Sequence, residues 1–182
     1  QQFEQVIDAV EKVFPGIKNG AITRIGTRYI NLLMPKKGFT INDYMQSSWL
    51  PNSTDTSLPF EASEGFHNRV LMNYETSQGN LRVDSNLFNP KDGSPFVVLP
   101  TDIMDGQDTG LEIAGQPWWS ESINDKVPYV ILDIDLGKEL REDFSKDLIF
   151  STINSMRSFT RKAFEMCVRD TAREHWVQLP HK

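Results

Sequence analysis

The chain has 182 residues, a length that one hydrophobic core can serve without a disulfide or a metal ion to hold it together. Its formal net charge of -6 repels polyanions and argues against nucleic acid as a partner. The single cysteine predicts a reducing, cytoplasmic location, and no apolar run is long enough to span a membrane. We therefore expect one domain over residues 1–182. Because the chain opens at Gln1 inside a helical pattern, we also expect that a preceding N-terminal segment is missing from it.

The first part of the chain predicts two helices and one long strand. Apolar residues recur at helical spacing over residues 3–14, and Pro15 ends the pattern. Residues 21–34 are rich in β-branched and aromatic side chains, which favour a strand. A short helix is expected over residues 41–46, and a polar loop over residues 52–63.

Further strands are expected in the middle of the chain. Residues 66–75 and 80–88 predict a hairpin, because a turn-rich link with Gly79 joins them. Residues 96–99 predict a short strand between two prolines. Residues 127–136 alternate in character and predict a strand. The side chains that this alternation places toward the core are Val130, Leu132, Ile134 and Leu136.

Residues 145–174 contain neither proline nor glycine and predict one long helix, spanning roughly 45 Å at 1.5 Å per residue. Its apolar stripe consists of Ile149, Ile153, Met156, Phe159, Ala163 and Cys167. A turn with several acidic residues is expected before it, formed by Glu139, Glu142 and Asp143. The pattern as a whole predicts an α+β fold, in which an antiparallel sheet of about five strands is covered by this long C-terminal helix and by the N-terminal helix.

Two arginines are the first candidate for a binding site. The alternation of a strand places Arg24 and Arg28 on one face and Tyr29 on the other. Two guanidinium groups on one face can bind a phosphate or a carboxylate through paired hydrogen bonds. The structural alternative, which we favour, is that both arginines pair with carboxylates across the sheet.

Two aspartates on one strand face are the second candidate. Asp133 and Asp135 could hold a divalent cation or act as an acid and a base. A metal site needs more than two ligands, and we predict no metal. Pairing of Arg24 or Arg28 with one of these aspartates is the interpretation that we favour.

An aromatic pair, Trp118 and Trp119, could anchor a partner protein or close an edge of the core. No nucleotide-binding loop or nucleophile elbow is present, so no cofactor is expected. Cys167 lies on the apolar stripe of the predicted helix, where a buried, inert thiol is expected.

The motif at residues 24–31 resembles the hallmark of a sporadically distributed family of uncharacterised prokaryotic proteins, a strand reading Arg-x-Gly-x-Arg-Tyr-Ile-Asn. The strand with Asp133 and Asp135 and the helix with Phe159 and Phe164 extend the likeness over most of the chain. The resemblance implies a front segment that this chain lacks, and it assigns no catalytic activity to the chain.

From these observations we expect a non-catalytic protein-interaction or regulatory module whose partner is another protein or a second copy of itself. The alternative is an enzyme or a sensor that binds a small anionic ligand between the sheet and the long helix. Its pocket would be lined by Arg24, Arg28, Tyr29 and Asp133.

Overall fold

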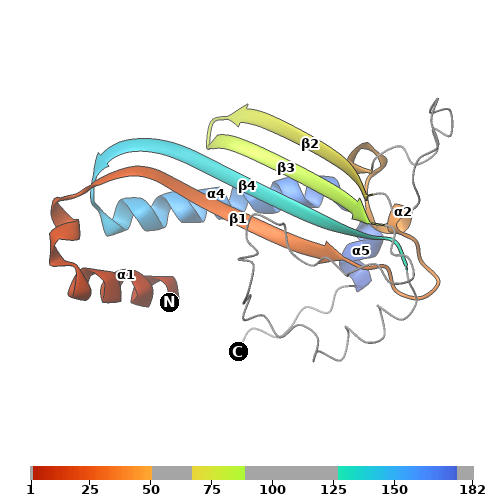
Figure 1. The fold of residues 1–182 in the computed structure, drawn as a ribbon, viewed down its shortest axis with the longest axis horizontal. Coiled ribbons are helices and arrows are strands. Elements are labelled where there is room, and N and C mark those ends of the chain that lie inside the picture. The colour runs from red at the N-terminus through yellow and green to blue at the C-terminus, as the bar shows by residue number, and fades with distance from the viewer. Residues whose placement is uncertain (1, 51–66, 89–126, 176–182) are drawn as a thin grey trace.

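The computed structural model describes residues 2–50, 67–88 and 127–175. Its centre is a four-stranded antiparallel sheet with the strand order β1-β4-β3-β2, shown in Figure 1. The strands are β1 (Ala21–Leu33), β2 (His67–Thr76), β3 (Gly79–Phe88) and β4 (Tyr129–Asp143). The helices are α1 (Gln2–Val13), η1 (Pro15–Asn19), α2 (Ile41–Tyr44), η2 (Ser47–Trp49), α4 (Lys146–Cys167) and α5 (Asp170–His175). The predicted α+β class and antiparallel sheet are confirmed, with four strands in place of about five, and the expected strand at 96–99 lies outside the described residues.

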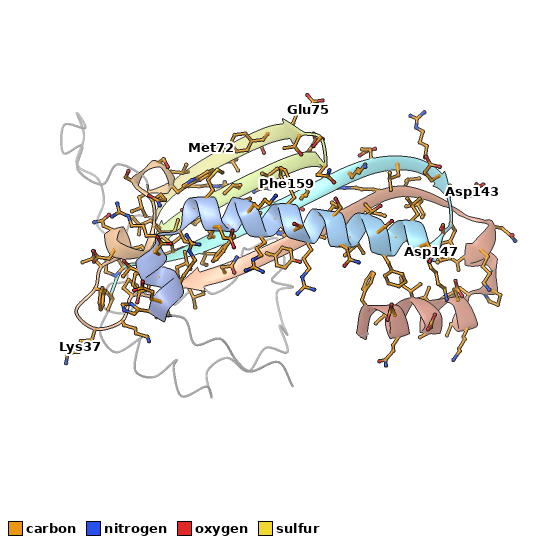
Figure 2. The ribbon with its side chains drawn as sticks, turned by 180° about the vertical axis from the view of Figure 1, so that it is seen from behind. Lys37, Met72, Glu75, Asp143, Asp147 and Phe159 are labelled. Atoms are coloured by element: carbon orange, nitrogen blue, oxygen red, sulfur yellow. The ribbon has the colours of Figure 1, made fainter. Side chains whose placement is uncertain are left out.

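The sheet has two unlike faces, because alternate residues of each strand point to opposite sides. The helix-side face packs against α4, which runs along the sheet in Figure 2. It carries the apolar residues Ile25, Leu33, Leu81, Val83, Leu87, Val130, Leu132, Ile134 and Leu136. The far face, turned away from α4, carries the charged residues Arg28, Arg82, Asp84, Asp133 and Asp135. The prediction that alternate residues of 130–136 face the core is therefore confirmed.

The C-terminal helix is shorter than the sequence predicts. It ends at Cys167, because Val168 is extended and forms an isolated antiparallel bridge with Met45. The backbone N–H of Gln46 donates to the carbonyl of Cys167 at 2.9 Å, and that of Arg169 donates to the carbonyl of Tyr44 at 2.8 Å. These contacts with a distant segment satisfy the backbone that would otherwise continue the helix. The prediction of one helix over residues 145–174 is wrong, and 22 residues span about 33 Å.

Strand β4 is longer than the sequence predicts. The expected turn at Glu139, Glu142 and Asp143 is wrong, since these residues pair with β1: Arg24 lies opposite Glu139, and Ala21 lies opposite Asp143. Their acidic side chains face solvent, so the alternation of apolar residues that marks the first half of β4 is lost here. Pairing with the long β1 partner supplies the backbone hydrogen bonds that keep this stretch extended.

Helix α1 does not cover the sheet, in contrast to the prediction. It lies beside the N-terminal part of α4, at the end of the molecule in Figure 2. Lys146 of α4 binds the carboxylates of Asp8 at 2.6 Å and Glu11 at 2.9 Å, and Phe3 meets Phe150 edge to face. None of the α1 side chains described by the structure is buried, and much of its apolar stripe stays exposed.

The β2–β3 hairpin turns through Ser77 and Gln78, as the sequence predicts. Gly79 follows with a φ of +126°, in the region that L side chains rarely adopt. A Cβ at this position would lie 2.3 Å from the carbonyl oxygen of Gly137 on the neighbouring strand β4. Glycine is thus required both by the backbone angle and by the close approach of the two strands.

Two alanine substitutions separate these effects. Gly38 also has a positive φ, of +91°, but a Cβ there would meet nothing within 4 Å. We expect Gly38→Ala to lower the free energy of unfolding by about 1 kcal/mol, from backbone strain alone, and Gly79→Ala to lower it by about 3 kcal/mol. Urea denaturation measures both losses. Equal losses would show that the hairpin moves to accept the Cβ.

Candidate functional site

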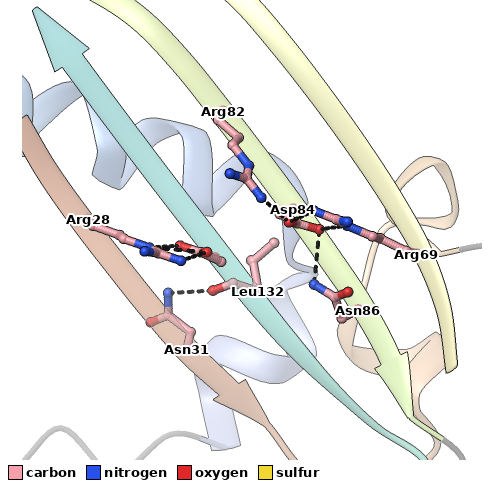
Figure 3. A network of polar contacts seen from close by, with 8 residues as sticks. Arg28, Asn31, Arg69, Arg82, Asp84, Asn86 and Leu132 are labelled. Atoms are coloured by element: carbon pink, nitrogen blue, oxygen red, sulfur yellow. Dashed lines mark hydrogen bonds and ion pairs between the residues drawn. The ribbon is translucent and has the colours of Figure 1, made fainter. Parts of the chain in front are cut away.

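The far face of the sheet carries an ion pair that joins β1 to β4. The Arg28 guanidinium donates from Nε to Oδ1 of Asp133 at 2.9 Å and from Nη2 to Oδ2 at 2.6 Å, as Figure 3 shows. Asp133 is only 3% exposed. The favoured interpretation, in which Arg24 or Arg28 pairs with Asp133 or Asp135, is confirmed for Arg28 and Asp133. The fork of Arg28 is thus engaged within the sheet.

A second polar cluster surrounds Asp84 on the same face. Arg69 of β2 donates to both carboxylate oxygens of Asp84, and Arg82 donates to Oδ2 at 2.8 Å. Asn86 donates to Oδ1 at 3.0 Å, as Figure 3 shows. In the register of the sheet, Asp84 lies directly opposite Asp133. Two buried carboxylates therefore meet at the centre of this face, and the arginines compensate their repulsion.

The pKa of Asp84 depends on the balance between burial and the neighbouring arginines. Burial raises the pKa of its carboxyl group, but the hydrogen bonds and positive charges of Arg69 and Arg82 outweigh burial. The net result is a pKa below the ordinary value of 3.8. The cluster therefore holds an ionised carboxylate at the centre of the sheet, which is a structural task.

Arg24 and Asp135 are the other charged residues that the sequence singles out on this face. Arg24 is exposed, and its guanidinium lies over Gly137, where a Cβ would come within 2.8 Å of Nη2. Asp135 lies opposite both Arg28 and Arg82 in the register, yet these arginines bind Asp133 and Asp84 instead. Gly137 thus gives the Arg24 side chain room to lie across the strand.

The structure separates Tyr29 from the predicted arginine site. Tyr29 points to the helix side of the sheet, whereas Arg24, Arg28 and Asp133 belong to the far face. One pocket between sheet and helix cannot hold all four residues, because the sheet itself lies between them. The composition predicted for this pocket is therefore wrong, although Tyr29 does line a cleft.

That cleft lies between β1 and α4 and has a volume of about 240 Å³. We call it the β1–α4 cleft. It is lined by Tyr29, Asn31, Arg157, Thr160, Arg161 and Phe164. Apolar atoms make up most of its surface, with aromatic rings from Tyr29 and Phe164, and its two arginines lie one helical turn apart on α4. A surface of this kind can take an apolar side chain and present positive charge beside it.

Arg157 and Arg161 were not among the residues predicted from the sequence. Their spacing of four residues on a predicted helix was a usable signal, since it places both on one face. What the spacing leaves open is whether that face meets β1, because this depends on how α4 lies on the sheet. Arg69, Arg82 and Asp84 were missed for the same reason, as their contacts follow from the order of the strands.

Strand β1 is an edge of the sheet within the part of the chain that the structure describes. It is 13 residues long and pairs with β4 on one side. In an antiparallel edge strand, about half of the backbone N–H and C=O groups point away from the partner strand. The β1–α4 cleft adjoins this strand, since Tyr29 and Asn31 of β1 line it.

The remaining candidate residues either have structural roles or lie outside the residues that the structure describes. Burial raises the pKa of the Cys167 thiol to about 12, in keeping with the expected inert thiol. His175 bonds to the Tyr44 hydroxyl at 2.9 Å, so it belongs to the packing of α5. Among residues 2–50, 67–88 and 127–175 no group of three or more His, Cys, Asp or Glu is placed to hold a metal ion. Trp118 and Trp119 lie outside the described residues.

Comparison with known proteins adds no function. No family model, no curated protein and no solved structure matches the chain. The resemblance carried by residues 24–31 therefore stays a prediction. Of the helices that the structure describes, none has the length and apolar character needed to cross a membrane.

The Asp84 cluster predicts a stability that depends on pH. We expect Asp84→Asn to lower the free energy of unfolding at pH 7 by about 2 kcal/mol, because an amide loses the charge-assisted hydrogen bonds. The pKa of Asp84 is depressed in the folded state, so its stabilisation is present above the ordinary value of 3.8 and is lost as the pH falls through the lower folded value. The difference from the unchanged protein should shrink below that pH.

The control is Asp135→Asn on the neighbouring strand. Among the described residues the Asp135 carboxylate has no hydrogen-bond or ion-pair partner, so a smaller loss is expected. Thermal unfolding followed by circular dichroism from acid to neutral pH compares the two variants. A loss for Asp84→Asn that is the same at every pH would contradict the assignment.

Proposed function

We propose that this chain is a non-catalytic protein-interaction module that binds an extended segment of a partner along the β1 edge. The observation that carries the proposal is the position of the long β1 edge beside the β1–α4 cleft. An extended segment added to a sheet edge gains main-chain hydrogen bonds, while adjacent pockets select its alternate side chains. Strand β1 combines an edge of the described sheet with an adjacent cleft.

Charged residues on an edge strand can also have a protective role. Arginine and lysine on exposed edges protect sheets from unwanted pairing. Arg24 and Arg28 alone are therefore no argument for a binding site. The cleft is what favours a binding site, because protection of an edge does not require an apolar hollow next to it.

A small anionic ligand in the same cleft is the alternative function. Arg157 and Arg161 would supply its counter-charges, and it would act as the substrate of an enzyme or the signal of a sensor. The volume of about 240 Å³ favours a side chain of a partner, since pockets for small molecules usually hold about 300–1,000 Å³. The mainly apolar lining points in the same direction.

A matched pair of tyrosines tests the β1 edge. Tyr29 on β1 and Tyr74 on β2 both belong to the helix-side face of an edge strand, and they are 39% and 38% exposed. Peptides selected from a random library on the purified protein should protect β1 amides from hydrogen exchange. Tyr29→Ala should weaken their binding about tenfold, as expected for a buried aromatic contact, and Tyr74→Ala should leave it unchanged.

Two results would contradict the proposal. One is that no peptide is enriched, and the other is that enriched peptides protect β2 or α1 instead of β1.

Thermal-shift measurements with inorganic phosphate and nucleotides test the small anionic ligand, because a ligand at 100 times its dissociation constant stabilises the folded state by about 2.7 kcal/mol. A shift that Arg157→Gln abolishes would favour the small anionic ligand.

Self-association is the other form of protein binding that the sequence suggests, and α1 is the surface that supports it. Pairing of two β1 edges would offer the exposed Arg24 of each copy no acidic partner on the other strand, since β1 has no acidic residue. The stripe on α1 is different, because Val6 is 55% and Val13 67% exposed, and Phe14, which follows the helix, is 65% exposed. A homodimer would bury this stripe.

Native mass spectrometry at increasing protein concentration tests the homodimer. A dimer is expected, and Val13→Glu should abolish it, because the charge would have to be buried. Gln5→Glu adds the same charge on the opposite side of α1 and should leave the dimer intact. A chain that stays monomeric at the highest concentration reached would exclude self-association through this stripe.

A further inference from the structure

The charges around the β1 edge allow the partner to be described more closely. On the assumption that β1 binds an extended segment, we propose that this segment is acidic, with an apolar side chain that enters the β1–α4 cleft and carboxylates at two-residue spacing from it. The proposal rests on the proposed function and adds the chemistry of the partner.

The cleft itself selects an apolar side chain. Tyr29 and Phe164 supply aromatic surface. The Thr160 hydroxyl donates to the carbonyl of Met156 at 3.0 Å, so its hydrogen is used inside the helix. The Asn31 amide lies 3.4 Å from the carbonyl of Leu132 and is turned toward the sheet. The polar groups of the lining that remain for a partner are therefore mainly the arginines.

The two arginines are open to a new partner. Within the described part of the chain Arg157 forms no ion pair or hydrogen bond through its side chain. Arg161 pairs with Glu165 at 3.0 Å, but the two side chains are 80% and 37% exposed. An exposed pair four residues apart on a helix is weak and is readily exchanged for another carboxylate. Both guanidinium groups can thus turn toward an acidic segment.

The spacing of the arginines matches that of an extended chain. One turn of α4 separates Arg157 from Arg161, which corresponds to an advance of about 6 Å along the helix. Side chains on the same side of a strand repeat every two residues, or about 6.7 Å. A carboxylate two residues from the apolar side chain would therefore lie about one such step along the strand from it, within the span that the two arginines cover.

The far face adds positive charge from the other side. The intervening side chains of an added strand would point to this face, where exposed Arg24 lies. Strand β1 has no acidic residue, and although Asp133 neutralises Arg28, Arg24 remains as an exposed positive charge in a chain whose net charge is -6. This local reversal of sign favours an acidic segment over a second copy of β1, which would bring like charges together.

A pair of synthetic peptides tests the inference. The first is a short strand-forming peptide with one phenylalanine, flanked by glutamates two residues before and after it. The second replaces those glutamates with glutamines. Fluorescence anisotropy should show that the acidic peptide binds at least tenfold more tightly at low salt, and that added salt reduces the difference.

Three variants of α4 connect the effect to the cleft. Arg157→Gln and Arg161→Gln should each weaken binding of the acidic peptide roughly threefold, as expected for an exposed charge pair, and leave the glutamine peptide unaffected. Lys162→Gln removes one exposed charge from the same helix without touching the cleft lining, and should have little effect. Circular dichroism confirms that each variant is folded.

The outcomes separate this inference from the proposed function. Equal binding of both peptides, with protection of β1 amides, would overturn the acidic partner and keep the β1 edge as a binding site. Binding of the acidic peptide that Lys162→Gln weakens as much as Arg157→Gln would reduce the effect to general attraction, and would also overturn it. Failure of both peptides to bind would reject the acidic segment, whatever the library selection on the β1 edge shows.

Discussion

The pairing of β1 with β4 is the constraint on which the rest of the structure depends. These are the two longest strands, and their antiparallel register places Arg28 beside Asp133 on one face and Tyr29 beside Ile134 on the other. Because side chains alternate along a strand, a shift of β1 by one residue would send Arg28 into the apolar core beside Ile134. The cost of burying an unpaired guanidinium makes such a shift unfavourable.

The two faces that this pairing creates have different tasks. The helix-side face forms the core with α4, and the far face holds two buried carboxylates among arginines from three strands. Such a cluster is stable only when all its members are paired, which gives it a strong influence on strand order. The charged residues that look like a ligand site thus serve the sheet, while the surface offered to a partner lies at its β1 edge.

The segment around Met45 determines where α4 ends. Its bridge to Val168 ends the helix, and Tyr44, which bonds to His175, holds α5 against α2. Helix propensity alone would carry α4 further, since no proline or glycine follows Cys167 for several residues. The backbone hydrogen bonds of residues 44–46 outweigh that weak preference, and the position of α4 over β1 is settled together with the end of the helix.

The sequence by itself determined the elements whose signals are local. The alternation of 130–136, the Gly79 turn and the apolar stripe of α4 each arise from the short-range geometry of a strand, a turn or a helix. Alternation and charge also predicted that Arg24 or Arg28 pairs with Asp133 or Asp135, and the structure decided that the pair is Arg28 with Asp133. The tertiary structure alone decided that Tyr29 shares a cleft with Arg157 and Arg161, that α1 leaves the sheet uncovered, and that α4 stops at Cys167. These features depend on contacts between residues far apart in the chain, and no local pattern records which distant surfaces meet.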